Sequence, residues 1–248
     1  MISKLRNYLF KRQFPNMILE TLLLLLNNRR TKNKVIIDNK EYPYLFHTYN
    51  NMGITERSIE IPIIYHYLTT RKIINVLEIG NVTNYYEDYF PNVFPNKTVV
   101  DKIEHNYNII TCDIVNYKPN KKFDFIFSIS TFEHMDSDLG RNPDYKPGAS
   151  KLCTVAADNI VYCYNELLAV GGIMIITAPM GYTPEWDLTF RNDWLEKYPF
   201  KSIKRKVFKR INEEEWMQLK DDFNINEPMA YGTPYPYANY VSIIEIKK

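Results

Sequence analysis

The feature that most constrains the fold of this chain is a series of short apolar runs in its middle part, each ending in a polar residue or a glycine. The five runs cover residues 75–79, 98–100, 108–112, 123–129 and 173–177. Strands that alternate with helical segments predict a mainly parallel sheet covered on both faces. Because ligands bind beyond the carboxyl ends of the strands in open sheets of this kind, the residues that end these runs are candidates for a site.

Two later segments complete the predicted sheet. Residues 204–211 and 240–246 alternate polar and apolar side chains, which is the period of a half-buried strand. We therefore expect two antiparallel strands after the parallel ones, giving seven strands in all.

Helical patterns lie before, between and after these strands. We predict a helix over 55–68 that starts at Thr55 and contains Pro62, a long helix over 150–170, and a helix near 213–220 that Asn212 caps. The predicted fold class is α/β: a mostly parallel seven-stranded sheet with antiparallel C-terminal strands and helices on both faces.

The length of the chain suits one large domain with an extension. At 248 residues it can form a single α/β core, and no stretch rich in Gly, Ser and Pro divides it. We predict one domain over 55–248 and an N-terminal helical and hairpin extension over 1–54 that packs on it. The extension would hold a helix over 17–28 and a strand, turn and strand over 34–46, with Asp38 and Asn39 in the turn.

The charge is uneven and the apolar segments are short. Residues 1–34 hold eight basic residues against Glu20 alone, which suits either an anionic surface or a helix with a solvated basic face. The apolar stretch around Glu20 is too short for the roughly 20 residues of a membrane span. Three cysteines without C-x-x-C spacing indicate thiols in a reducing compartment, so we expect a cytoplasmic protein without a transmembrane segment.

The segment NVLEIGN at the end of the first run points to a nucleotide-like cofactor. An acidic residue, a spacer and a glycine, here Glu78 and Gly80, let the backbone turn sharply and approach a ligand. The carboxylate suits the cationic end of a sulfonium donor. A dinucleotide fits less well, because the following GNVTNYY lacks the further glycines of G-x-G-x-x-G.

Two aspartates end the next two runs. Asp101 follows the first motif by close to the roughly 20 residues that separate such a motif from an acidic residue that binds ribose hydroxyls. Asp113 ends the third run, where its carboxylate could accept a hydrogen bond from an adenine amino group. With Glu78, the sequence places three acidic residues at three consecutive strand ends.

Taken together, these motifs resemble those of class I S-adenosylmethionine-dependent methyltransferases. The resemblance covers residues 55–177 and is carried by NVLEIGN, VVDKIEH, TCDIVNY, FDFIFSISTFEHM and ELLAVGGIMIITAP, in the order and spacing of that family. It implies a Rossmann-like methyltransferase fold and S-adenosyl-L-methionine as the cofactor. The resemblance implies Glu78 and Gly80 at the methionine side of the cofactor, Asp101 at the ribose, and Asp113 with Ile114 at the adenine. The other cofactor-binding residues that we expect are Asn81, Lys102 and Ser130. Val82 and Asn84 depart from the family pattern, which has glycines there, so the cofactor loop should be wider or differently bent.

The candidate catalytic residues follow the fourth run. Transfer to a hydroxyl needs a general base, and His134 is the best candidate because its reference pKa of about 6.5 suits proton uptake near neutrality. Glu133 could orient it, and Asp136 is a reserve base. A structural histidine that bonds a backbone group is the alternative reading of His134.

The predicted acceptor is a hydroxyl of a small molecule or of a sugar or glycan. We expect Arg57, Glu60, Tyr182 and Tyr235 to bind it, because ring faces stack on sugar C–H surfaces while hydroxyls meet charged groups. The segment TERSIEIP also resembles methyltransferases found among glycan-building enzymes, which implies a glycosyltransferase as a partner. No metal is predicted, although Asp136, Asp138 and Asp144 leave a magnesium site open.

Three alternatives remain at this point. A nucleic-acid methyltransferase is supported by the basic first 34 residues, but no D/N-P-P-Y/F or Pro-Cys motif of base-modifying enzymes follows the fourth run. A non-catalytic interaction module would explain the missing loop glycines. An NAD-dependent oxidoreductase would bind a dinucleotide instead.

Overall fold

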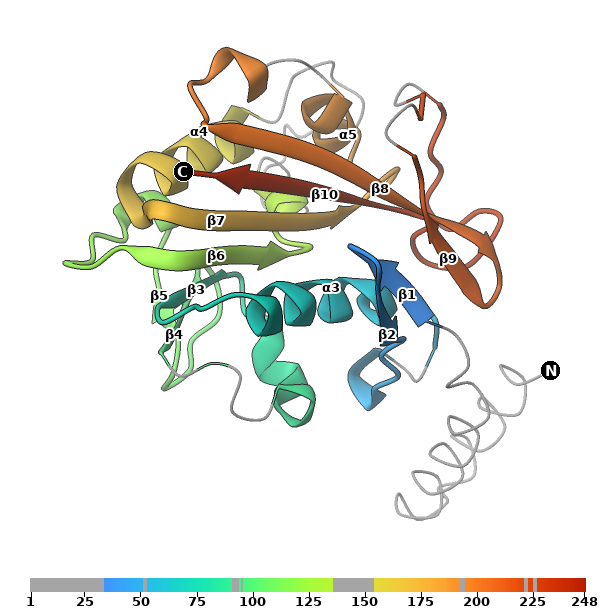
Figure 1. The fold of residues 1–248 in the computed structure, drawn as a ribbon, viewed down its shortest axis with the longest axis horizontal. Helices are drawn as coiled ribbons and strands as arrows, with labels where there is room; N and C mark the ends of the chain where they lie inside the picture. Colours follow the sequence, from blue (N-terminus) through green and yellow to red (C-terminus); the bar gives the residue numbers. More distant parts are fainter. Residues whose placement is uncertain are drawn as a thin grey trace.

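The computed structural model describes residues 34–50, 53–90, 94, 96–135, 154–191, 195–220, 223–224 and 227–248. The helix predicted over 17–28 lies outside these residues. Figure 1 shows a central twisted sheet with helices packed against it and a small hairpin at one side.

Among the described residues, eight strands form the central sheet, in the order β5-β4-β3-β6-β7-β10-β8-β9. Its parallel half pairs β4 with β5 and with β3, and β6 with β3 and with β7. In the other half, β10 runs antiparallel to both β7 and β8, and β9 is antiparallel to β8. The strands are β3 (Val76–Ile79), β4 (Lys97–Asp101), β5 (Ile110–Thr111), β6 (Phe123–Ile129), β7 (Leu168–Pro179), β8 (Ser202–Asn212), β9 (Glu215–Gln218) and β10 (Tyr240–Lys247). All five predicted parallel strands and both predicted antiparallel strands are confirmed.

The eighth strand, β9, corrects the prediction of a helix near 213–220 and of a seven-stranded sheet. Asn212 does not cap a helix: its side-chain oxygen accepts a hydrogen bond from Glu214 N at 2.8 Å and closes the turn between β8 and β9. Trp216 is buried and Met217 is half exposed, which is the alternation of a strand. Burial of the Trp216 ring against the sheet therefore outweighed the helix propensity of the glutamates that precede it.

The two faces of the sheet carry separate apolar cores. On one face, α3 (Arg57–Thr70) packs with the hairpin β1 (Lys34–Ile37) and β2 (Lys40–Pro43). On the other lie α4 (Thr154–Tyr162), which continues as a wider helical turn over Cys163–Leu167, and α5 (Pro184–Arg191). The remaining described helices are single short 3-10 segments, among them η2 (Thr83–Tyr89), η3 (Ile114–Asn116) and η4 (Phe132–His134). Within this described part, no helix combines the length and apolar character needed to cross a membrane.

Pro62 lies inside α3 without breaking it. A proline has no N–H, so the carbonyl of Ser58, four residues earlier, receives no bond from position 62. That carbonyl instead accepts a hydrogen bond from Leu45 N at 3.1 Å. The carbonyl that Pro62 leaves without a partner in the helix therefore links α3 to the segment that follows the hairpin.

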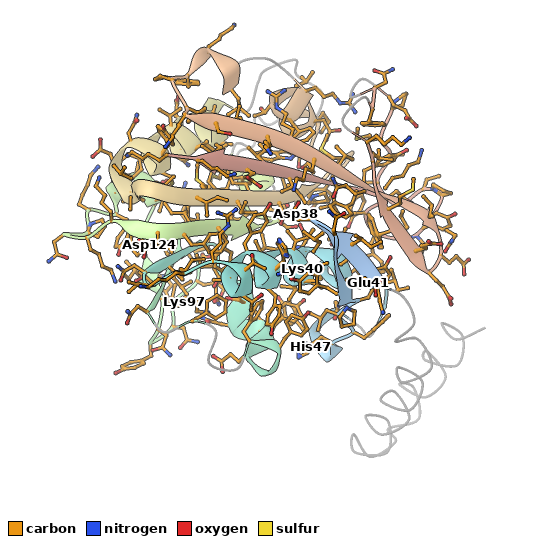
Figure 2. The ribbon with its side chains drawn as sticks, in the orientation of Figure 1. Asp38, Lys40, Glu41, His47, Lys97 and Asp124 are labelled. Carbon is orange, nitrogen blue, oxygen red and sulfur yellow. The ribbon has the colours of Figure 1, made fainter. Side chains whose placement is uncertain are left out.

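The hairpin has the predicted turn. Ile37 pairs with Lys40, and Asp38 and Asn39 have φ values of 47° and 64°, as a two-residue hairpin turn requires. Figure 2 labels Asp38 at the point where the hairpin meets the sheet, and its carboxylate lies 3.1 Å from Lys206 Nζ of β8. The hairpin prediction is confirmed, whereas the division into an extension over 1–54 and a domain over 55–248 stays a prediction.

Candidate active site

A cleft of about 370 Å³ opens where the parallel strands end. It lies beyond β3, β4, β5 and β6, where the chain order reverses from one side of β3 to the other, the place at which open α/β sheets bind ligands. The cleft is lined by Ile79, Gly80, Val100, Asp101, Lys102, Ile103, Cys112, Asp113, Ile114, Ser130, Thr131, His134, Met135, Val155 and Asn159. Six of the eight predicted cofactor residues are among them; Glu78 and Asn81 are not.

Gly80 forms the floor of the cleft and has no room for a side chain. Its φ is +86°, and a Cβ built there would lie 2.2 Å from Thr131 Oγ1. Gly80 N donates to Val100 O at 2.9 Å, which fixes the turn against β4. The glycine is therefore required both by its left-handed backbone and by the close approach of the turn after β6.

Asp101 keeps part of its hydrogen-bonding capacity for a ligand. Its Oδ1 accepts from Ile103 N at 2.7 Å and Glu104 N at 2.8 Å, and its Oδ2 accepts from Asn81 N at 3.1 Å. A carboxylate has about four acceptor positions, so one on Oδ2 is left over. Asn81 does not line the cleft, because its side chain donates to Glu104 Oε2 at 2.5 Å.

Glu78 faces away from the cleft and organises the loop after β3. Its buried carboxylate accepts from Val82 N at 2.9 Å, from Thr83 N at 2.6 Å and from the Thr83 hydroxyl. Lys97 Nζ, labelled in Figure 2, lies 3.4 Å away. Glu78 thus caps η2, where an anion favours the helix N-terminus. The loop that contains Val82 and Asn84 is thus fixed by this carboxylate.

The far end of the cleft combines an apolar wall with one ion pair. Ile114 is buried beside Val100. Lys102 Nζ lies 3.2 Å from Asp113 Oδ2, and both side chains are partly exposed. This end can therefore hold a flat apolar group while offering a carboxylate at its edge.

Ser130, Arg57 and Glu60 form one hydrogen-bonded cluster at the other end. The Ser130 hydroxyl lies 2.9 Å from Glu60 Oε1 and 3.1 Å from Oε2, and Arg57 donates both to Ser130 Oγ and to Glu60. The Glu60 side chain is fully buried and that of Arg57 is 19% exposed. Both predicted acceptor-binding residues of α3 thus contact a cleft residue, and their contact with an acceptor stays a prediction.

His134, the predicted base, is one of the titratable side chains of the cleft. It lines the cleft, is 42% exposed, and its Nε2 lies 3.7 Å from Glu133 Oε1. Burial, followed by repulsion from Arg57, lowers the pKa of His134 below its ordinary value. Burial raises the pKa of Glu133 well above the ordinary carboxyl value. The imidazole is therefore neutral near pH 7, the form that accepts a proton. The reserve base, Asp136, lies outside the described residues.

Aromatic rings extend from His134 away from the cleft. The His134 ring meets the edge of Tyr182 with centroids 5.4 Å apart, and Tyr182 contacts Tyr231 at 5.0 Å. Tyr235 does not join them: Arg210 covers its ring at 5.0 Å and its hydroxyl donates to Ile211 O. Within the tyrosine-rich segment 231–237, Tyr231 therefore reaches the end of the site at His134, whereas Tyr235 does not.

Sequence reasoning missed several cleft residues. Thr131 follows Ser130 directly, and its closeness to Gly80 has no local signal. Val155 and Asn159 lie four residues apart on α4, a spacing that places both on one helix face. Among the described residues, no three His, Cys, Asp or Glu side chains are grouped to hold a metal. Asp138 and Asp144, like the reserve base, lie outside these residues.

Comparison with known proteins gives partial similarities. No family model matches the chain. It is 32% identical over 108 residues to malonyl-[acyl-carrier protein] O-methyltransferase 2 of Ilyobacter polytropus, which is 38% of this chain and 42% of that protein. It is 29% identical over 109 residues to O-methyltransferase 1 of the same organism, 37% of this chain and 40% of that protein. The matches thus span about two fifths of these relatives.

Solved structures of similar shape include two methyltransferases. N-methyltransferase NodS from Bradyrhizobium japonicum, in complex with S-adenosyl-L-homocysteine, has a TM-score of 0.47 at 14% identity over 78% of this chain and 87% of NodS. A SAM-dependent methyltransferase from Archaeoglobus fulgidus has a TM-score of 0.45 at 15% identity over 76% and 93% of the two chains. The fold itself is given by the strand order and strand directions described above, which are those of the Rossmann-like methyltransferase fold, with eight strands in the sheet among the described residues.

Proposed function

We propose that this protein is an S-adenosylmethionine-dependent methyltransferase that methylates a hydroxyl of a small molecule or sugar. The observation that carries the proposal is the convergence of Gly80, Asp101, Asp113 and Ile114 on one cleft at the carboxyl ends of the parallel strands. Similarity to two O-methyltransferases supports an oxygen acceptor.

The residues of the cleft fit this cofactor. The open acceptor position on Asp101 Oδ2 suits a ribose hydroxyl, and Ile114 with Val100 suits the adenine face. Asp113, which also lines the cleft, can accept from an exocyclic amino group. Gly80 brings backbone without a side chain to the lining of the cleft, and a Cβ there would clash with Thr131. When bound, the cofactor supplies an electrophilic methyl group on a sulfonium cation.

His134 is proposed as the general base. A neutral imidazole that lines the cleft can take the proton of an acceptor hydroxyl as the oxygen attacks, while Tyr182 holds the ring from its edge. Glu133 Oε1 lies 3.7 Å from Nε2, where this buried carboxyl can help to orient the ring. Positioning of the acceptor in line with the methyl group is the other requirement for direct transfer.

The wider context stays a set of predictions. These are the glycan acceptor, a glycosyltransferase partner, the cytoplasmic location and the two-part division of the chain. The nucleic-acid alternative depends on the basic first residues, which lie almost entirely outside the described part.

Calorimetry on the full chain tests the cofactor. We expect S-adenosylhomocysteine to bind with micromolar affinity and NADH not to bind; absence of heat with the former would leave a non-catalytic module. Transfer of a radiolabelled methyl group onto a panel of sugars, nucleotide-sugars, phenols and RNA then tests the acceptor. Label on RNA with strong salt dependence would overturn the small-molecule proposal.

A further inference from the structure

Ser130 has a backbone conformation that a serine does not adopt without support. Its φ is +42°, in the left-handed region, where side chains other than Gly, Asn and Asp are strained. Such a residue persists only when its surroundings impose the conformation. Two sets of contacts do so here: Ser130 N donates to Thr177 O of β7 at 2.8 Å, and its hydroxyl is bonded by α3.

The bonds from α3 use the proton of the Ser130 hydroxyl and one of the two lone pairs on its oxygen. Glu60 accepts its proton and Arg57 donates to its oxygen. The Ser130 side chain is therefore committed to the helix. What the residue contributes to the cleft is the path of its backbone and the placement of the next residue.

That next residue, Thr131, sets the width of the cleft floor. Thr131 Oγ1 lies against Gly80 so closely that a Cβ there would be 2.2 Å away, and it donates to Ile129 O at 3.0 Å. Gly80, Ser130 and Thr131 all line the cleft. A turn at Ser130 with negative φ would therefore carry Thr131 to a different position relative to Gly80.

We propose that Arg57 and Glu60 are positioning residues: by bonding the Ser130 hydroxyl they keep the turn after β6 left-handed and so hold the cleft in the width that the cofactor needs. The inference rests on the proposed function. Two residues of α3, which lie 70 and 73 positions before Ser130 in the chain, would thus control cofactor affinity without touching the cofactor.

The decisive variant is Glu60→Gln combined with Ser130→Gly. In Glu60→Gln, an amide N–H₂ group replaces one of the oxygens that accept from Arg57 and the Ser130 hydroxyl. We expect S-adenosylhomocysteine to bind about tenfold more weakly, because the strain of a left-handed residue is of the size that changes affinity by about this factor. Glycine adopts positive φ unaided. The double variant should therefore regain affinity to within about twofold of wild type, while its melting temperature stays as low as that of Glu60→Gln.

Glu245→Gln is the matched control. Glu245 is another buried carboxylate that contacts α3, where it accepts from the Tyr67 hydroxyl at 2.5 Å, but it lies in β10 away from the cleft. This variant should lower the melting temperature and leave the affinity unchanged.

Isothermal titration with S-adenosylhomocysteine reads affinity without any acceptor. Unchanged affinity in Glu60→Gln, or a double variant that binds no better than Glu60→Gln, overturns the positioning role. If the wild-type chain itself does not bind S-adenosylhomocysteine, the proposed function fails instead, so the two failures are distinct.

Discussion

Replacing Asp101 by asparagine removes one acceptor atom from the cofactor cleft and changes the shape of the side chain very little. The amide keeps one oxygen for Ile103 N and Glu104 N, which Oδ1 accepts in the wild-type chain. Its N–H₂ group replaces Oδ2. In the wild-type chain Oδ2 accepts from Asn81 N and has one further acceptor position, which we assign to a ribose hydroxyl.

The expected loss of affinity follows from these contacts. A hydrogen bond to a charged acceptor contributes about 1.5–3 kcal/mol, and a factor of ten in affinity corresponds to about 1.4 kcal/mol. The dissociation constant for S-adenosylhomocysteine should therefore rise roughly 10- to 150-fold. The lost bond from Asn81 N should also cost about 1 kcal/mol of stability, which is about 2–4 °C in melting temperature for a chain of this size.

Asp124→Ala is the control for this loss of stability, because it removes the one oxygen, Oδ2, that accepts both backbone bonds. Asp124, labelled in Figure 2, also accepts from two backbone groups, Ile74 N at 3.1 Å and Asn75 N at 2.9 Å, but it stands near the opposite end of β6. This variant should melt at a similarly lower temperature and bind S-adenosylhomocysteine like wild type. A folded Asp101→Asn protein with an affinity within about twofold of wild type would refute the role of Asp101 at the ribose.

Three further predictions concern catalysis, the cleft floor and acid stability. His134→Ala should lower turnover about 100-fold or more at nearly unchanged cofactor affinity. Because the pKa of His134 is lowered, the wild-type turnover should fall on acidification with a midpoint below the reference value of about 6.5. A rate that falls with a midpoint above that value would contradict the assignment. Gly80→Ala should abolish S-adenosylhomocysteine binding in calorimetry, because the added Cβ meets Thr131 and φ is +86°, and normal binding by a folded variant would show that the floor is not tight. Burial lowers the pKa of His66, so the folded chain binds this proton less readily than the unfolded chain and stability is lost as the pH falls below about 6.5; His66→Gln should flatten the fall in melting temperature between pH 7 and 5, and an equally steep fall would refute this.

The strands and the cleft were predictable because each signal is local. An apolar run with a polar end indicates a buried strand and the residue at its carboxyl end. The sequence therefore predicts that Asp101, Asp113 and Ser130 lie at one edge of the sheet, and all three line the same cleft. The turn of Asp38 and Asn39 is equally local.

The parts that failed depend on partners remote in sequence. Glu78 caps η2 because Thr83 and Lys97 converge on it, and Trp216 joins a strand because β8 lies beside it. Nothing in the loop sequence distinguishes Tyr231, which reaches His134 through Tyr182, from Tyr235, which Arg210 covers. These choices are made by tertiary packing.

The proline in α3 has a consequence for anyone who engineers this chain. Exchanging Pro62 for alanine would raise the intrinsic helix propensity of the segment by about 3 kcal/mol. It would also supply a new N–H that competes with Leu45 for the Ser58 carbonyl. A substitution chosen to strengthen the helix would thus loosen the attachment of the segment after the hairpin, on the same helical turns that carry Arg57 and Glu60.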